Sequence, residues 1–216
     1  MHNPAVKKLI KEYICKKPQI RKRLKEFKNL QNVDDEKVFS ELCFCILTPQ
    51  SKAVSCDKAI KNLESDDLLL NGSRNVISKK IRGLTRFHNN KAVYIVAARK
   101  FFTNGGKLLD IKDKLDKKDI FKTREWLVKN IKGIGYKEAS HFLRNIGLGK
   151  NIAILDTHIL KCLRRCGVFK KPLQPTSKKT YLKTEERMRQ FSKKIDISME
   201  ELDLLFWSQQ TGFIFK

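Results

Sequence analysis

A pair of glycines in the middle of the chain places the strongest constraint on its fold. Residues 131–137 read Ile-Lys-Gly-Ile-Gly-Tyr-Lys, so that Gly133 and Gly135 separate two amphipathic segments. The apolar positions are Trp126, Leu127 and Ile131 before the glycines and Ala139, Phe142, Leu143 and Ile146 after them. This spacing is helical, and glycine tolerates the positive φ of a sharp turn. The segment therefore predicts a tight helix-to-helix hairpin.

The rest of the chain follows the same helical period. For example, Phe39, Leu42, Cys43 and Ile46 recur at i, i+3, i+4 and i+7, whereas strand-like alternation is scarce. Helices are predicted at roughly 4–15, 36–47, 51–63, 73–80, 89–103, 117–131, 136–147, 157–166, 179–194 and 198–210. We therefore expect an all-α fold with short connections.

The charge balance indicates a polyanionic partner. Lys and Arg number 47 against 23 Asp and Glu, a formal net charge of +24 that is spread along the chain. A single cluster such as residues 16–28 is more simply explained as a solvated helix face. No apolar run reaches about 18 residues, and the N-terminus lacks a signal-peptide core. We expect a soluble intracellular protein that does not use a membrane.

The six cysteines, at positions 15, 43, 45, 56, 162 and 166, contain no Cys-x-x-Cys pair of the kind found in zinc sites. Most are expected to be buried thiols that pack in the interior, without a disulfide framework.

The hairpin also predicts a phosphate site. The amides of Gly133, Ile134 and Gly135, together with the N-terminus of the following helix, can hold a DNA phosphate without reading its sequence. The alternative is an ordinary corner between two packed helices. The positive charge of the chain and the residues around the hairpin favour the DNA-binding interpretation.

Four motifs, in this order along the chain, resemble the helix-hairpin-helix DNA glycosylase superfamily. They are Leu-Thr-Pro-Gln-Ser at 47–51, Phe-His-Asn-Asn-Lys-Ala at 87–92, Gly-Ile-Gly-Tyr-Lys at 133–137 and Leu-Asp-Thr-His at 155–158. The resemblance covers most of the chain. In the bifunctional members a lysine follows the hairpin after one residue, as Lys137 does here, and Asp156 matches the family aspartate.

The resemblance implies two catalytic residues. A neutral Lys137 amine would attack the anomeric carbon of a damaged nucleotide, form a Schiff base and allow β-elimination. Asp156 would stay ionised and stabilise the positive charge that develops on the sugar. Its local sequence also predicts a helix N-cap before Thr157, and the two roles are compatible. His158 is expected to be structural.

The lesion is a narrower question. No cysteine follows Cys166, so the chain cannot form the C-terminal iron-sulfur cluster usual in the endonuclease III and adenine-mismatch branches. It also lacks room for the additional N-terminal domain of the mammalian-type oxoguanine branch. The compact type 2 8-oxoguanine DNA glycosylase/lyase group, found mainly in archaea, fits best, and its members also end at a lysine.

This group implies a pocket for the damaged base. The terminal Lys216 and its carboxylate are expected to help form that pocket. Trp207 and Phe215 are candidates to stack on or enclose an extruded base, although core packing explains Trp207 equally well. Gln50 and Phe87 are candidates for filling the gap in the duplex or reading the opposite cytosine.

We expect two helical domains with the cleft between them: 33–149, ending in the hairpin, and 1–32 combined with 150–216. The predicted partner is double-stranded DNA containing 8-oxoguanine, bound by a monomer in the cytoplasm of a prokaryote, in association with the nucleoid. The resemblance implies no organic cofactor or catalytic metal and allows a monovalent cation at the hairpin.

Four other functions stay open at this stage. The chain could be a lyase for another oxidised base or a monofunctional glycosylase, a non-enzymatic helix-hairpin-helix DNA-binding module, or a basic RNA-binding protein. Lys137 disfavours the monofunctional enzyme, and a binding module does not require Lys137 and Asp156 together.

Overall fold

The computed structural model describes residues 3–104, 106 and 109–215, and within these residues it contains helices and no strands. The predicted all-α class is confirmed. The elements are α1 (Pro4–Asn29), the 3-10 helix η1 (Leu30–Asn32), α2 (Asp35–Leu47), α3 (Ala53–Ser65), α4 (Leu68–Asn71), α5 (Arg74–Ile81), α6 (His88–Thr103), α7 (Ile120–Asn130), α8 (Tyr136–Asn145), α9 (Thr157–Arg165), α10 (Lys178–Ile195) and α11 (Met199–Thr211).

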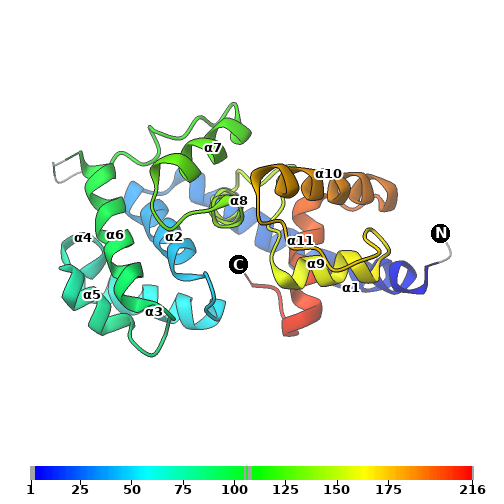
Figure 1. Cartoon of the computed structure of the whole chain (residues 1–216), viewed down its shortest axis with the longest axis horizontal. Helices are drawn as coiled ribbons and strands as arrows, with labels where there is room; N and C mark the ends of the chain where they lie inside the picture. The colour runs from blue at the N-terminus through cyan, green and yellow to red at the C-terminus, as the bar shows by residue number, and fades with distance from the viewer. Residues whose placement is uncertain (1–2, 105, 107–108, 216) are drawn as a thin grey trace.

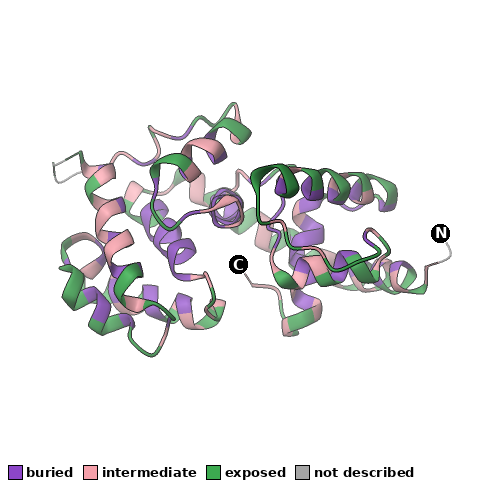
Figure 2. Ribbon diagram, viewed as in Figure 1, coloured by how far each residue is buried: buried purple, intermediate pink, exposed green. Residues whose placement is uncertain are grey.

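The helices form two lobes that meet at α8 (Figure 1). One hydrophobic cluster takes its buried side chains from residues 38–152, and a second takes them from residues 6–27 and 153–206. We call these the hairpin lobe and the terminal lobe. Figure 2 shows that buried positions concentrate on α2 and α8, whereas α10 turns an exposed face outward. The two clusters are consistent with two domains, although the exact boundaries stay a prediction.

The first helix is longer than the sequence predicted. It was expected at 4–15 but continues to Asn29 with Pro18 inside it. An interior proline removes a backbone donor and normally costs about 3 kcal/mol or more. Beyond Pro18, however, Ile20 and Phe27 are buried on the same helix, and α1 contacts both α11 and α8. Tertiary burial of the second half therefore accounts for a helix that local propensity disfavours.

Most of the cysteines are buried, as predicted. None forms a disulfide among the described residues, and Cys43, Cys45, Cys56 and Cys162 are buried. Cys15, by contrast, is exposed, because it lies on the outer face of α1. No group of three or more side chains suited to holding a metal ion occurs in the described part of the chain. Nor does any helix in that part have the length and apolar character needed to cross a membrane.

A buried ion pair joins the two lobes. Arg124 on α7 donates to both carboxylate oxygens of Glu185 on α10, at 2.6 and 2.9 Å, and their side chains are 1% and 2% exposed. Arg124 also donates to Ser140 on α8. The same Glu185 carboxylate accepts the backbone N–H of Ala153 at 2.8 Å. One pair of charges thus connects the hairpin to the segment that leads into α9.

Arg124→Met should lower the free energy of unfolding by about 3 to 5 kcal/mol, because it leaves the Glu185 charge buried without its main partner. Urea denaturation would measure the loss. The matched control is Lys61→Met, which breaks the contact of Asp57 with a lysine whose side chain is 72% exposed and should cost less than about 1 kcal/mol. Equal small losses in the two variants would contradict the structural role of the buried pair.

Candidate active site

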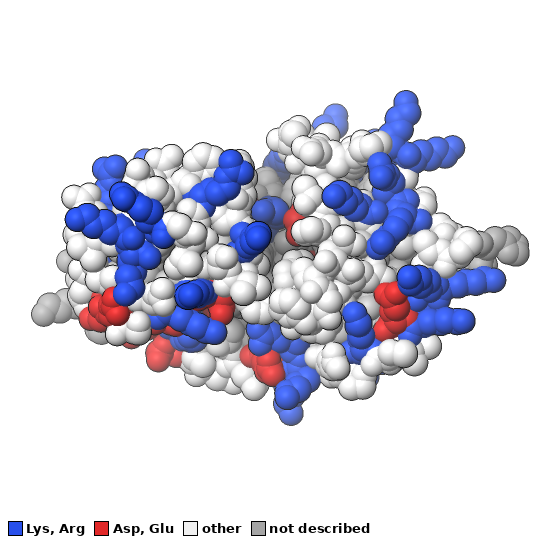
Figure 3. Space-filling model, turned by 90° about the horizontal axis from the view of Figure 1, so that it is seen from below, with Lys and Arg blue, Asp and Glu red and all other residues white. Residues whose placement is uncertain are grey.

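A cleft of about 980 Å³ lies between the lobes. On the hairpin lobe it is lined by the α2–α3 loop and the start of α8; on the terminal lobe, by the start of α9, residues 174–178 and the last turns of α11. Figure 3 shows Lys and Arg side chains gathered on both lobes, on either side of this hollow. Such a distribution suits a chain of phosphates that passes across the cleft.

The predicted hairpin is present between α7 and α8. Gly133 has a φ of +84°, and a Cβ at this position would lie 2.5 Å from the ring of Tyr94. Both the backbone and the close approach therefore require glycine. Ile134 is buried in the core of the hairpin lobe, and its packing there anchors the turn. Gly135 is the N-cap of α8 and lines the cleft.

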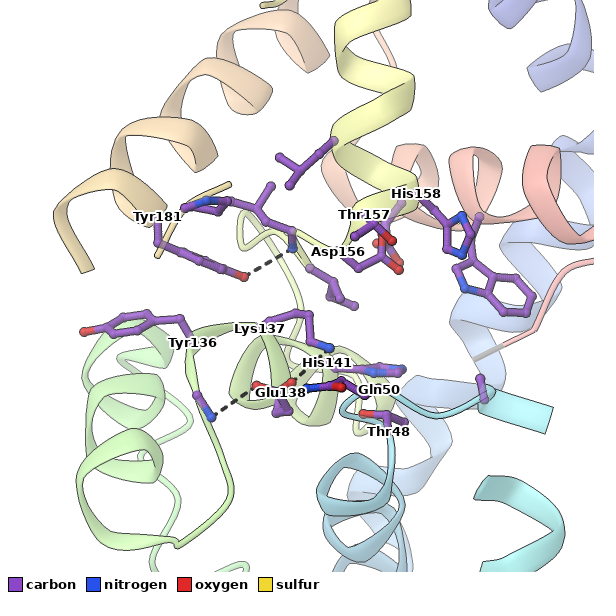
Figure 4. Close-up of a pocket in the computed structure, with 18 of the residues that line it drawn as sticks. Thr48, Gln50, Tyr136, Lys137, Glu138, His141, Asp156, Thr157, His158 and Tyr181 are labelled. Carbon is purple, nitrogen blue, oxygen red and sulfur yellow. Dashed lines mark hydrogen bonds and ion pairs between the residues drawn. The ribbon is translucent and has the colours of Figure 1, made fainter. Parts of the chain in front are cut away.

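Lys137 is the second residue of α8 and lines the cleft with a side chain that is 30% exposed. Its Nζ lies 2.9 Å from Oε1 of Glu138, while the other oxygen of that carboxylate accepts the Gly135 N–H at 3.2 Å. Glu138 thus contacts both the amine and the hairpin backbone (Figure 4). Glu138 was not predicted from the sequence, although a glutamate three residues after an N-cap is a recognisable capping signal.

Asp156 lies on the other side of the cleft, at the start of α9 (Figure 4). Its Oδ1 accepts the Ile159 N–H at 2.8 Å, which is the N-cap contact that the local sequence predicted. Tyr181 on α10 holds the backbone before Asp156. Its hydroxyl donates to the Ala153 carbonyl at 2.7 Å and accepts the Leu155 N–H at 3.3 Å. Capping and packing therefore hold this carboxylate beside the cleft.

Further polar groups reach the cleft without having been predicted. His141 follows Lys137 by one helical turn and packs edge-on against Phe44, with ring centroids 5.5 Å apart. Asp203 on α11 is buried, and this burial raises the pKa of its carboxyl to about 6, although Arg144 lies 3.6 Å away. No sequence signal identifies Asp203, because its place depends on how α11 packs against α1, α9 and α10.

His158, expected to be structural, also lines the cleft. Its Nδ1 is buried and has no hydrogen-bond partner among the described residues. The backbone around it belongs to α9, directly after the Asp156 cap. The position of the ring at the cleft is thus set by α9.

The predicted base-pocket residues are only partly brought together. Gln50 and Trp207 line the cleft. Phe215 is not among the lining residues, but it stacks on Trp207 with ring centroids 5.7 Å apart. Phe87 is 52% exposed and does not line the cleft. The residue before it, Arg86, donates a backbone hydrogen bond to Ser51 in the α2–α3 loop, which does line the cleft. Lys216 lies outside the described residues.

The whole chain is similar to proteins of one family. A family profile described as "8-oxoguanine DNA glycosylase" matches residues 20–197. The "8-oxoguanine DNA glycosylase/AP lyase" of Fusobacterium nucleatum is 45% identical over 204 residues, which cover 91% of this chain and 90% of that protein. The similarity therefore extends over both lobes.

Two solved structures match the fold. The crystal structure of the 8-oxoguanine DNA glycosylase of Thermotoga maritima aligns with a TM-score of 0.86 and 34% identity, covering 98% of each chain. The 8-oxoguanine glycosylase/lyase of Methanocaldococcus jannaschii, in complex with a 15mer DNA containing 8-oxoguanine, aligns with a TM-score of 0.85 and 38% identity. That match covers 96% of this chain and 99% of the other.

Gly133→Ala should weaken binding to undamaged duplex DNA by about tenfold, because moving the hairpin away from Tyr94 misplaces the amides that are predicted to hold a phosphate. Gly83→Ala is the matched control, since Gly83 has a φ of +78° and nothing within 4 Å of an added Cβ. Both variants share the backbone cost of about 1 to 2 kcal/mol. Fluorescence anisotropy would compare them, and equal affinities would argue against a phosphate site at the hairpin.

Proposed function

Because the chain belongs to the 8-oxoguanine DNA glycosylase family, we propose that it excises 8-oxoguanine from double-stranded DNA and then cuts the strand at the abasic site. It is thus a DNA N-glycosylase and an AP lyase. The observation that carries the proposal is the cleft itself: Lys137 and Asp156, from different lobes, line its two sides next to the glycine hairpin.

The damaged nucleotide must leave the duplex before it can reach Lys137, because the amine lies inside the cleft. Enzymes that act on a base commonly extrude it and hold it between apolar and aromatic side chains. A cleft of about 980 Å³ has room for a nucleotide, and Trp207 supplies an aromatic wall that Phe215 backs. We propose that Lys216, which follows Phe215, contributes to the base pocket.

Lys137 then acts as the nucleophile. Its neutral amine attacks C1′ while the bond to the base breaks, and the base leaves with the bonding electrons and takes up a proton. The C1′–O4′ bond then breaks as the attached nitrogen loses a proton and O4′ gains one, which opens the sugar ring and leaves an imine on C1′. This imine acidifies the C2′ hydrogen, and loss of that proton expels the 3′ phosphate. Glu138, which already contacts Nζ, is our candidate to accept the ammonium proton before attack.

Asp156 stabilises the positive charge that develops on the sugar as the base leaves. A carboxylate held by an N-cap contact and by the α10 contacts to its backbone needs little rearrangement during the reaction, which is the condition for effective electrostatic stabilisation. The chemistry requires no organic cofactor. A monovalent cation between the hairpin and a DNA phosphate is the one ion that we propose.

The proposed partner is duplex DNA containing 8-oxoguanine, the ligand named for the structure of the Methanocaldococcus jannaschii relative. The basic side chains on both lobes and the hairpin amides hold the backbone on either side of the lesion. Gln50 and Phe87 are proposed to fill the gap or to read the opposite cytosine. We propose that the protein acts as a monomer on the chromosome in a prokaryotic cytoplasm.

Lys137→Gln should abolish covalent trapping by borohydride on duplex DNA with one 8-oxoguanine opposite cytosine, because glutamine cannot form a Schiff base. Lys132→Gln is the control, since it removes the exposed lysine within the same hairpin and should leave trapping intact. Trapping that persists in Lys137→Gln would assign the nucleophile to another amine. Trapping by the unaltered protein on abasic DNA alone would retain the lyase but reject the lesion.

Asp156→Asn should lower the single-turnover rate of base excision by about 100- to 1,000-fold, because it removes the negative charge that faces the sugar. Asparagine caps helices as well as aspartate does, so the fold and the affinity for an uncleavable duplex should change little. Rapid-quench kinetics and anisotropy would measure the two quantities. Parallel losses of rate and affinity would assign Asp156 to capping alone.

A further inference from the structure

Lys91 is a buried lysine that contacts the α2–α3 loop, which lines the cleft on the hairpin lobe. It lies in the first turns of α6 and is only 3% exposed. Its Nζ donates three hydrogen bonds, to the carbonyl oxygens of Leu47 and Pro49 at 2.6 and 2.9 Å and to the hydroxyl of Ser51 at 2.9 Å. The end of α2 and the α2–α3 loop thus surround this ammonium with three oxygen atoms.

This arrangement keeps the charged amine of Lys91 in the protein interior, where burial disfavours a charge. Burial lowers the pKa of Lys91 to about 8, and the nearby positive charges of Lys137 and Arg86 act in the same direction. The amine is nevertheless mainly protonated at neutral pH. Its hydrogen-bond partners in the described structure are two carbonyls and a hydroxyl, which suit a donor with three hydrogens. The contacts to the loop therefore offset much of the cost of burying the charge.

The α5–α6 turn contacts the same loop through Ser51. The backbone N–H of Arg86 donates to Ser51 Oγ at 2.9 Å, so this hydroxyl links the α5–α6 turn to the loop that Lys91 holds. The next residue, Phe87, has a φ of +56°, and Gln50 has a φ of +54°. Non-glycine residues rarely adopt this conformation, and it persists where surrounding contacts impose it. Lys91 and Ser51 supply such contacts for both residues.

We propose that Lys91 is a positioning residue that holds Gln50 and Phe87 together as one edge of the cleft and so determines how the protein engages the duplex around a lesion. The inference rests on the proposed function. Lys91 is distinct from the nucleophile, because its amine is enclosed by three oxygens and 3% exposed, whereas the side chain of Lys137 is 30% exposed in the cleft. Its loss should affect duplex recognition more than bond breaking.

The test compares Lys91→Met with Lys100→Met, a matched change at an exposed position on the same helix. Lys91→Met should slow excision of 8-oxoguanine from a duplex by about 10- to 100-fold, because a small displacement of a positioning group has effects of that size. It should also change the relative rates of excision opposite cytosine and opposite adenine, because Gln50 and Phe87 are proposed to contact the opposite strand. Cleavage of a preformed abasic site in single-stranded DNA should stay within about twofold of the unaltered protein, as should all activities of Lys100→Met.

Two outcomes would overturn the proposal. One is an equal loss of activity on duplex and single-stranded substrates in a folded Lys91→Met protein, which would make Lys91 part of the chemistry or of general stability. The other is an unchanged duplex rate and opposite-base preference. Circular dichroism and thermal unfolding would establish that each variant is folded.

A second variant and a second measurement cover the remaining cases. If Lys91→Met does not fold, Ser51→Ala removes the hydroxyl that joins the two loops and should give a smaller defect with the same duplex selectivity. Binding to a duplex with a tetrahydrofuran abasic analogue opposite cytosine needs no chemistry. A loss of this binding in Lys91→Met would support the positioning role even if the unaltered protein excised no 8-oxoguanine, which would contradict the proposed function alone.

Discussion

The buried pair of Arg124 and Glu185 is the interaction on which the site depends. The proposed chemistry needs an amine from one lobe and a carboxylate from the other, held at a constant separation. Glu185 meets this need because it binds Arg124 beside the hairpin and the Ala153 amide in the segment that leads to Asp156. Since both charges are almost fully buried, neither can replace its partner with water, and separating the lobes would be costly.

The abundant positive charge serves different purposes according to its surroundings. Most Lys and Arg side chains are exposed, and together they produce the long-range field that attracts a polyanion. Among the described residues, three buried cations instead organise the interior. Arg124 joins the lobes, Lys91 holds a loop through carbonyl oxygens, and Arg144 packs over the ring of Phe27 while it faces Asp203. The net charge of +24 therefore measures the attraction for DNA and says little about the core.

The hairpin is the part of the site that local sequence predicts best. Two glycines between amphipathic segments leave few alternatives, and the Gly133 backbone and its contact with Tyr94 agree with that expectation. The length of α1 shows where local reasoning is wrong. Pro18 lowers helix propensity, but Ile20 and Phe27 gain more by being buried against other helices than the proline costs. The helices that bury these two side chains are distant in sequence, so the residues around Pro18 do not reveal that α1 continues.

The sequence by itself determined the helical class and the hairpin, because these depend on short-range periodicity and on two glycines. Its resemblance to a family of DNA glycosylases also implied Lys137 and Asp156 as candidates. Only the tertiary structure decided that both side chains line one cleft, that Glu138 contacts the amine, and that Lys91 is enclosed while Lys137 is accessible. The physical reason is that burial and the approach of groups distant in sequence are properties of packing. Two lysines with the same chemistry therefore differ in role only once the chain has folded around them.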